Sequence, residues 1–203
     1  MEKIVFATGN INKGYEIEEK FKSEGVPVEV VQMDFVEPEV NDIETVSRSK
    51  VLQAYNALGR PCFVIDSGFN IFHYPNNPGY PGAFVRRSGI SEDIDGLLEV
   101  MKDVQSRGCQ FLDCLTYYDG EDFHVFYGRD IGELTTEKRG IPNRIMRSDL
   151  WFVFKPVGFS KTLAEMSDEE RQNRKNGHVS AKGQFIEWYR ENYIDVKKYV
   201  KDK

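Results

Sequence analysis

The sequence predicts an α/β fold, a single domain over residues 1–203 with an elongated mixed β-sheet and helices in two lobes. The chain opens with an apolar run, a glycine turn, a helical pattern and a second apolar run, which is the order of an α/β unit. Asp119–Gly120 joins two β-rich runs, which is typical of an antiparallel hairpin, so the sheet should be mixed. The length of 203 residues suits one sizeable domain, and we see no internal repeat or linker.

Composition limits the class of protein more than it indicates a function. Hydrophobic residues make up 40% and charged residues 30%, as in an ordinary globular protein. The net charge of -6 argues against a partner that is a nucleic acid polymer, although a local basic pocket remains compatible with it. The three cysteines lack metal-ligand spacing, which indicates reduced thiols in a cytoplasmic protein. No apolar run approaches the ~18 residues of a membrane span, and no signal peptide precedes the first strand, so we expect no membrane partner.

The first third of the chain predicts alternating strands and helices. The predicted strands are Ile4–Ala7, Val28–Val31 and Phe63–Ile65, and the predicted helices run from Asn12 to about Ser23 and from Asn41 to about Leu58. Asn12 and Asn41 are the expected N-caps, and Ile17 and Phe21 should face inward from the first helix. The inward stripe of the second helix should be Ile43, Val46, Lys50, Ala54 and Ala57.

The remaining elements are shorter and follow turn and cap signals. A Pro- and Gly-rich loop separates the Asp66 strand from a helical pattern over Glu92–Val104. Further strands are predicted at Cys109–Tyr118, Phe123–Tyr127, Ile131–Leu134 and Trp151–Phe154, and helices from Ser167 to about Arg174 and from Ser180 onward. Serine at the start of both helices is a favourable N-cap.

Asp66 is the residue on which a catalytic interpretation depends. A short apolar run, predicted to be buried on both faces, ends in Asp66–Ser67–Gly68, which we interpret as a turn. An acid held at the end of a buried strand is partly desolvated, which suits a metal ligand or a general base. The alternative is an aspartate that only caps a turn.

Three further groups point to phosphate chemistry. Thr8–Gly9–Asn10 and Lys13 stand at a helix N-terminus, which favours a phosphate, although an ordinary turn before a helix has the same appearance. Glu37 and Glu39, with Asp66, are oxygen ligands of the kind that Mg²⁺ prefers. Lys50 either points into a cleft or extends to solvent. Together these groups indicate metal-assisted attack on a phosphoanhydride.

Four motifs in one order resemble those of the inosine triphosphate pyrophosphatase family, the non-standard purine NTP pyrophosphatases. The first is the family's T-G-N-x-x-K-x-x-E, from Thr8 to Glu16, and the second is Asp66–Ser67–Gly68 followed by Pro78–Gly79. The third is T-x-A-E-M-x-x-E from Thr162 to Glu169. The fourth is Lys175–Asn176 with Ser180. The resemblance covers nearly the whole chain.

The resemblance implies an enzyme that hydrolyses nucleoside triphosphates to the monophosphate and pyrophosphate, with Mg²⁺, as a homodimer. Its substrates would be deaminated purine nucleotides such as ITP, dITP and XTP, bound in a cleft between the two lobes. By the same resemblance, the Thr8–Gly9–Asn10 turn, Lys13 and Lys50 would hold the phosphates. Asp66 would be metal ligand and proton acceptor, with Ser67 near the substrate. Either Glu37 or Glu39 would share the metal.

The chain departs from the family mainly where the family surrounds the base. The family's F-G-[YFW]-D-P becomes Phe152–Pro156, with Val153 for glycine and Lys155 for aspartate. Its S-H-R becomes Ser180–Ala181–Lys182, and Ile65 replaces a usually acidic residue. The substrate-binding residues expected on this side are Phe152, Lys155, Lys175, Ser180 and Lys182, with Arg144 and Arg147 as substitute contacts. In the family the aspartate, histidine and arginine surround the base, so their replacement by Lys155, Ala181 and Lys182 should alter selectivity. The alternatives are the same hydrolysis of a different or modified (d)NTP, or a catalytically silent nucleotide-binding protein.

Overall fold

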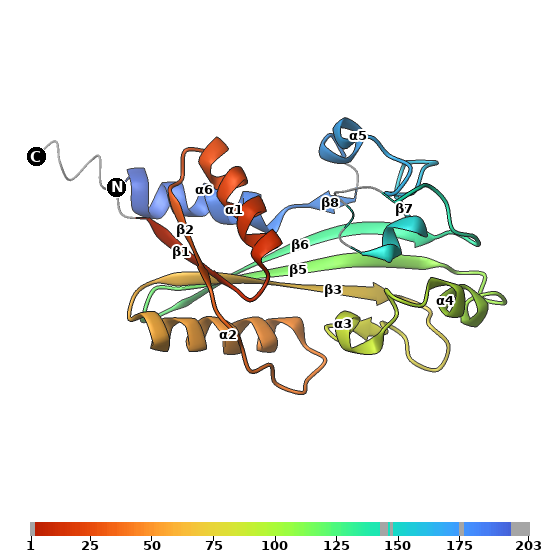
Figure 1. Cartoon of the computed structure of the whole chain (residues 1–203), viewed down its shortest axis with the longest axis horizontal. Coiled ribbons are helices and arrows are strands. Elements are labelled where there is room, and N and C mark those ends of the chain that lie inside the picture. Colours follow the sequence, from red (N-terminus) through yellow and green to blue (C-terminus); the bar gives the residue numbers. More distant parts are fainter. Residues whose placement is uncertain (1–2, 143–145, 147, 175–176, 196–203) are drawn as a thin grey trace, which may run out of the picture. The chain divides into compact units, whose positions relative to one another are not determined.

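A mixed β-sheet runs through the chain in the strand order β2-β1-β3-β5-β6-β7, with β4 paired to β3 and β8 to β6 (Figure 1). The structure, a computed structural model, describes residues 3–195 apart from 143–145, 147 and 175–176. Pairs β1–β2 and β1–β3 are parallel, whereas β4, β7 and β8 pair antiparallel to their neighbours. The predicted α/β class with a mixed sheet is therefore confirmed. Helices flank the sheet.

The strands are β1 Ile4–Thr8, β2 Val28–Gln32, β3 Cys62–Ile71, β4 Pro81–Gly82, β5 Gly108–Tyr118, β6 Phe123–Leu134, β7 Phe154–Pro156 and β8 His178–Val179. The helices are α1 Ile11–Ser23, α2 Ile43–Leu58, α3 Val85–Ser88, α4 Ile94–Val100, α5 Asp168–Gln172 and α6 Ala181–Tyr189, with a 3-10 turn η1 at Asp149–Phe152 and a π-helical turn η2 at Arg190–Asp195. None of the helices within the described ranges is long and apolar enough to cross a membrane.

The chain divides into two compact units, which are described separately below. The first unit comprises residues 1–66, 113–128 and 180–203, and the second comprises residues 67–112 and 129–179. Strands β3, β5 and β6 contribute residues to both. That residues 1–203 form a single domain stays a prediction.

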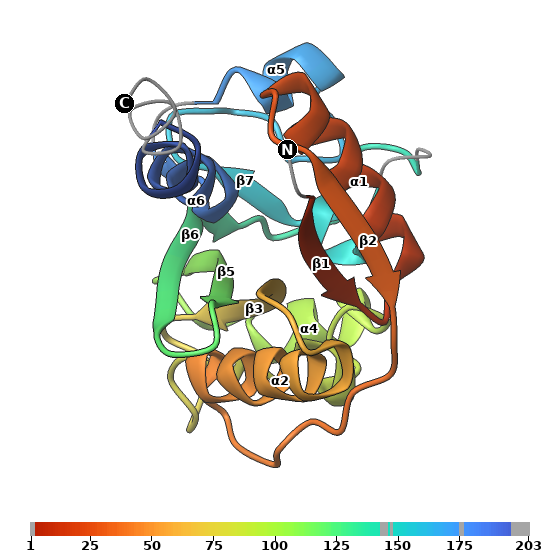
Figure 2. The same cartoon turned by 90° about the vertical axis from the view of Figure 1, so that its left-hand side faces the viewer.

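In the first unit, β1 separates two apolar cores, which explains why all five of its residues are buried. Side chains alternate along a strand. Ile4 and Phe6 therefore join the core of α1 and α6, while Val5 and Ala7 join the core of α2. The first core is completed by residues that include Ile17, Phe21, Phe63, Leu115 and Phe185, and the second by Val51, Ala54, Cys62 and Val64. Figures 1 and 2 show α1 running beside β1 and β2.

The N-caps of α1 and α2 differ from the predicted ones. Asn10, not Asn12, caps α1, because its side chain accepts hydrogen bonds from the amides of Asn12 and Lys13. Asp42, not Asn41, caps α2 and accepts from Thr45 N. In both cases the capping residue has extended backbone angles and comes directly before the first helical residue, as an N-cap requires.

The buried stripe of α2 also differs from the predicted one. Ile43, Val46 and Ala54 are buried as expected, but Ala57 is exposed. Ser47 and Val51 are buried instead. Burial of Ser47 is made tolerable by a hydrogen bond of 2.8 Å from its hydroxyl to Thr116 Oγ1. Lys50 lies at the margin of this stripe, half-buried.

The prediction that the strand ends in a turn at Asp66 is wrong, since β3 continues to Ile71. Phe69 and Ile71 are fully buried in the core of the second unit, and Phe69 and Asn70 pair with β4. Burial and strand pairing outweigh the turn preference of Ser67 and Gly68, because strand formation depends on context more than on local propensity.

The second unit surrounds one apolar core. Its fully buried members include Phe69, Ile71, Met101, Cys109, Leu150, Val153 and Phe154. The strand predicted at Trp151–Phe154 begins only at Phe154, because η1 precedes it. Ser148 caps η1, and Leu150 and Val153 both face the core, which is the three-residue spacing of a 3-10 turn. The hairpin predicted around Asp119–Gly120 is present as β5 and β6, and Ser167 and Ser180 cap α5 and α6 as predicted.

Candidate functional site

The site is organised around an ion pair between α2 and β3. Asp66 shares its face of β3 with Cys62 and Val64, the face that α2 covers. Lys50 on α2 therefore meets it, and Lys50 Nζ donates a hydrogen bond to Asp66 Oδ1. The two side chains are only 13% and 12% exposed. Of the two expectations for Lys50, extension to solvent is thus wrong.

Glu37 is the second carboxylate on Lys50. Glu37 Oε1 lies 2.7 Å from Lys50 Nζ, although the Glu37 side chain is 42% exposed. The ring of Phe35, in the same loop, has its centroid 5.9 Å from Lys50 Nζ. Glu39 is exposed and takes part in none of the hydrogen bonds or ion pairs found among the described residues. The geometry therefore favours Glu37 over Glu39 as the residue that accompanies Asp66.

Lys13 reaches the same strand from α1. Its Nζ donates to Ile65 O at 3.3 Å, and its charge acts on neighbouring Asp66. The turn before α1 is bonded internally: Thr8 Oγ1 accepts from Asn10 N at 3.1 Å, and the Asn10 side chain caps the helix. Two of the amides expected to face a phosphate are thus occupied by Asn10. A Cβ added at Gly9 would lie 3.4 Å from Met33 O, which is an ordinary van der Waals contact.

Burial and the neighbouring charges shift the pKa values of both Asp66 and Lys50. Burial raises the pKa of Asp66 above its ordinary value, and the charges of Lys50 and Lys13 only partly oppose this. Burial lowers the pKa of Lys50, but the carboxylates of Asp66 and Glu37 together outweigh burial and raise it. Lys50 therefore stays cationic at neutral pH. A carboxyl with a raised pKa is the type of group used as a general base.

The donor set fits a divalent cation that also binds substrate. Asp66 Oδ2 is buried and has no hydrogen-bond partner within the described residues, so one lone-pair face remains unsatisfied. No three His, Cys, Asp or Glu side chains of the described part converge as a complete metal cage. Mg²⁺ is commonly held by one or two carboxylates together with water and substrate phosphates. Asp66 and Glu37 match that arrangement.

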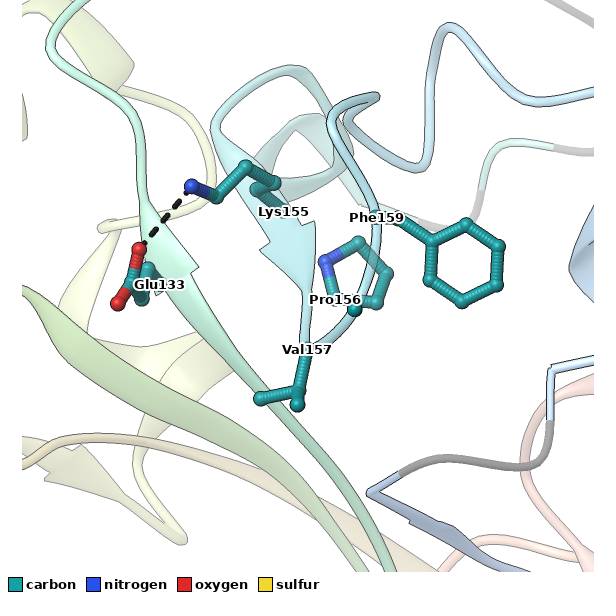
Figure 3. Close-up of a pocket in the computed structure, with 6 residues that line it drawn as sticks. Glu133, Lys155, Pro156, Val157 and Phe159 are labelled. Atoms are coloured by element: carbon teal, nitrogen blue, oxygen red, sulfur yellow. Dashed lines mark ion pairs between the residues drawn. The ribbon is translucent and has the colours of Figure 1, made fainter.

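Lys155 belongs to the second unit and lines a pocket of about 260 Å³ with Glu133, Pro156, Val157, Gly158 and Phe159. Figure 3 shows Lys155 extending from β7 toward Glu133 on β6. Their Nζ and Oε2 atoms are 3.1 Å apart, and the two residues are in register across the strands. Phe152 is half-buried on η1.

The other residues predicted to bind substrate lie on different elements, and Ser180 also has a structural role as a helix cap. Ser67 is exposed on β3 and, as the next residue along the strand, points to the opposite face from Asp66. Ser180 uses its hydroxyl to cap α6 by accepting from Gly183 N at 3.1 Å. Lys182 is half-buried in the first turn of that helix. The predictions for Lys175, Asn176, Arg144 and Arg147 lie outside the described residues.

The sequence did not indicate Phe35 or Glu133. Glu133 meets Lys155 because β6 and β7 pair in one particular register, which no local pattern reveals. Phe35 precedes Glu37 in an irregular loop, so periodicity gives no signal for it.

Comparison with known proteins identifies the family to which the chain belongs. A family model described as the Ham1 family matches residues 4–188. A dITP/XTP pyrophosphatase of Saccharolobus solfataricus is 31% identical over 95% of this chain and 96% of its own length. An inosine triphosphate pyrophosphatase of Kluyveromyces lactis is 28% identical over 83% of this chain and 87% of its own. The structure of a HAM1 protein from Coxiella burnetii has the same fold, with a TM-score of 0.75, 22% identity and coverage of 93% and 96%. The chain belongs to the Ham1 family.

Proposed function

We propose that this protein hydrolyses nucleoside triphosphates with noncanonical purine bases, such as ITP, dITP and XTP, to the monophosphate and pyrophosphate. The names of its relatives as dITP/XTP and inosine triphosphate pyrophosphatases support the substrate class. The observation that carries the proposal is the cluster of Lys13, Lys50, Glu37 and Asp66 in the first unit. It combines cations for phosphate oxygens with a buried carboxylate whose pKa is raised.

Each residue has a role that follows from its charge and position. Lys13 and Lys50 offset the negative charge of the phosphates and of the transition state. Water attacks the α-phosphorus, the α–β phosphoanhydride bond breaks, and pyrophosphate leaves. Asp66 orients that water and accepts its proton at Oδ2, the buried oxygen without a hydrogen-bond partner. The Thr8–Gly9–Asn10 turn shapes the α1 N-terminus against the phosphates.

Mg²⁺ is the proposed metal, held by Asp66 and Glu37, because hard oxygen ligands suit it. When bound, the ion would neutralise charge on the phosphates. We further propose that the protein is a homodimer, as the family resemblance implies, and that it is cytoplasmic. The second point is supported by Cys62, Cys109 and Cys114, which are buried free thiols.

A different nucleotide is the second candidate substrate, with the same hydrolysis. It is favoured by Lys155, which stands where the resemblance expects an aspartate and pairs with Glu133 in a pocket. A donor and an acceptor side by side would select bases by their hydrogen-bonding edge. Ser67, Phe152, Lys175, Ser180 and Lys182 remain proposed substrate contacts.

The test measures pyrophosphate release with Mg²⁺ from ITP, XTP, their deoxy forms and the four common NTPs and dNTPs. We expect preference for ITP or XTP, and loss of hydrolysis with nucleotide binding retained in Asp66→Asn. Turnover of a common nucleotide alone would favour the second candidate. A parent protein that binds nucleotides but hydrolyses none would overturn the proposal and indicate a silent binding protein.

A further inference from the structure

Gln53 on α2 forms two hydrogen bonds to the backbone of one loop residue. Gln53 Oε1 accepts from Val36 N at 3.0 Å, and Gln53 Nε2 donates to Val36 O at 2.8 Å. The side-chain amide thus pairs with both the N–H and the C=O of one residue, as the backbone of an adjacent β-strand would. Only one orientation of the amide makes both bonds, so the pair fixes the side chain as well as the loop.

The residue held in this way comes directly before Glu37. Lys50 and Gln53 are three positions apart on α2 and therefore project from the same side of the helix. Lys50 contacts the Glu37 carboxylate at 2.7 Å, while Gln53 holds the backbone at Val36. One face of α2 thus holds this loop segment at two points, one ionic and one neutral.

The two attachments respond differently to a bound cation. A divalent ion held by Asp66 and Glu37 would compete with Lys50 for the same carboxylates, because Lys50 pairs with both of them. The Gln53–Val36 bonds carry no charge and do not involve the carboxylates. They keep the backbone of Glu37 in place whichever cation its side chain contacts.

We propose that Gln53 is the positioning residue that presents Glu37 to the divalent cation, an inference that rests on the proposed role of Glu37 as a metal ligand. Residues that orient a ligand from behind affect metal affinity by about 10- to 100-fold when they are removed. The Gln53–Val36 bonds are exposed, so the lower end of this range, about 10-fold, is expected here. Gln53 also bonds Ser49 O at 3.3 Å within its own helix, which limits its freedom to follow a mobile loop.

The experiment titrates the full chain with Mn²⁺, as a spectroscopic stand-in for Mg²⁺, and follows free Mn²⁺ by electron paramagnetic resonance without nucleotide. Gln53→Met keeps the length of the side chain and removes both bonds, and it should raise the Kd for Mn²⁺ about 10-fold. Asn56→Met is the matched control, because Asn56 is exposed on the same helix, and should leave the Kd unchanged. Gln53→Leu is a second variant, which removes both bonds with a branched apolar side chain and adds no charge near the proposed site. It should weaken binding as well.

A double-mutant cycle separates positioning through Glu37 from a general loss of structure. In a Glu37→Gln background the Gln53→Met change should have no further effect on the Kd. An unchanged Kd in both Gln53 variants, while Glu37→Gln weakens binding, would overturn the inference and leave the proposed metal site standing. An unchanged Kd in Glu37→Gln would overturn the metal role of Glu37 and the inference together. Urea unfolding of each variant confirms that the compared proteins are folded.

Discussion

Replacing Lys50 by methionine removes the cation that two carboxylates share and keeps most of the side-chain length. Breaking a buried ion pair at one partner costs about 3–5 kcal/mol, because the other charge is left without compensation. The Lys50 and Asp66 side chains retain 13% and 12% exposure, so we expect the lower end, about 3 kcal/mol. The contact with Glu37 adds no more than about 1 kcal/mol, since Glu37 is 42% exposed.

The loss should depend on pH in a defined direction. Burial already raises the pKa of Asp66, and removing Lys50 raises it further because Lys50 is the strongest opposing influence. A carboxyl with a raised folded-state pKa contributes stability below its unfolded pKa, and that contribution is lost as the pH rises through the folded value. Lys50→Met should therefore differ from the parent most at neutral pH and least at acidic pH.

Two measurements check this expectation. Urea unfolding over a pH series gives the free energy of unfolding, and the pH profile of kcat/KM should have an acidic limb above the ordinary aspartate pKa. In the residual activity of Lys50→Met, the acidic limb of the kcat/KM profile should lie at a still higher pH. Lys102→Met is the control, because the Lys102–Glu99 pair is 58% and 71% exposed and should contribute less than about 1 kcal/mol. Equal stability of Lys50→Met and the parent at pH 7, or a difference independent of pH, would refute the argument.

Three further predictions concern other parts of the chain. Gly14→Ala should lower the free energy of unfolding by about 1 kcal/mol. The new Cβ would lie 2.7 Å from Cγ1 of Val30, and such overpacking costs about 1–3 kcal/mol. The higher helix propensity of alanine offsets only part of that cost. In a Val30→Ala background, Gly14→Ala should no longer lower the free energy of unfolding measured with urea, and an unchanged loss there would exclude the clash as its cause. Ser167→Ala should cost about 1 kcal/mol by removing the capping box of α5, with Ser160→Ala as an uncapped control. EDTA should abolish pyrophosphate release and Mg²⁺ should restore it, whereas full activity in EDTA would contradict the proposed metal requirement.

Sequence patterns were sufficient where burial follows a regular period. The apolar run at Ile4–Ala7 predicted the buried strand β1, and the helical pattern that follows identified Ile17 and Phe21 as core residues, which are both buried. Lys13 and Asp66 belong to motifs of the resemblance, which also implied a phosphate-binding role for Lys50, and the contacts bring the three residues to one strand. The choice between Glu37 and Glu39 was not accessible, because both lie in an irregular loop whose path depends on α2.

Patterns failed where a distant contact decides the conformation. Ser67 and Gly68 have turn propensity, yet the burial of Phe69 and Ile71 keeps β3 extended. Gln53 looks like an ordinary polar residue of a helix, and only its bonds to Val36 reveal its relation to the loop. The wrong turn prediction and the unnoticed Gln53 have the same origin, since a single sequence records local preference and not the distant partner that competes with it.

The charges of Lys13, Lys50, Asp66 and Glu37 bear on the proposed requirement for a metal. Lys13 and Lys50 carry two positive charges, and Asp66 and Glu37 carry two negative charges, so these four side chains are neutral together. A triphosphate adds several negative charges, which this cluster alone does not compensate. The proposed divalent cation, held by Asp66 and Glu37, would supply positive charge for the phosphates, and Lys50 would then be available to the substrate. In the structure Lys50 pairs with both carboxylates, which offsets their mutual repulsion and is consistent with a nearly buried lysine in the proposed binding site.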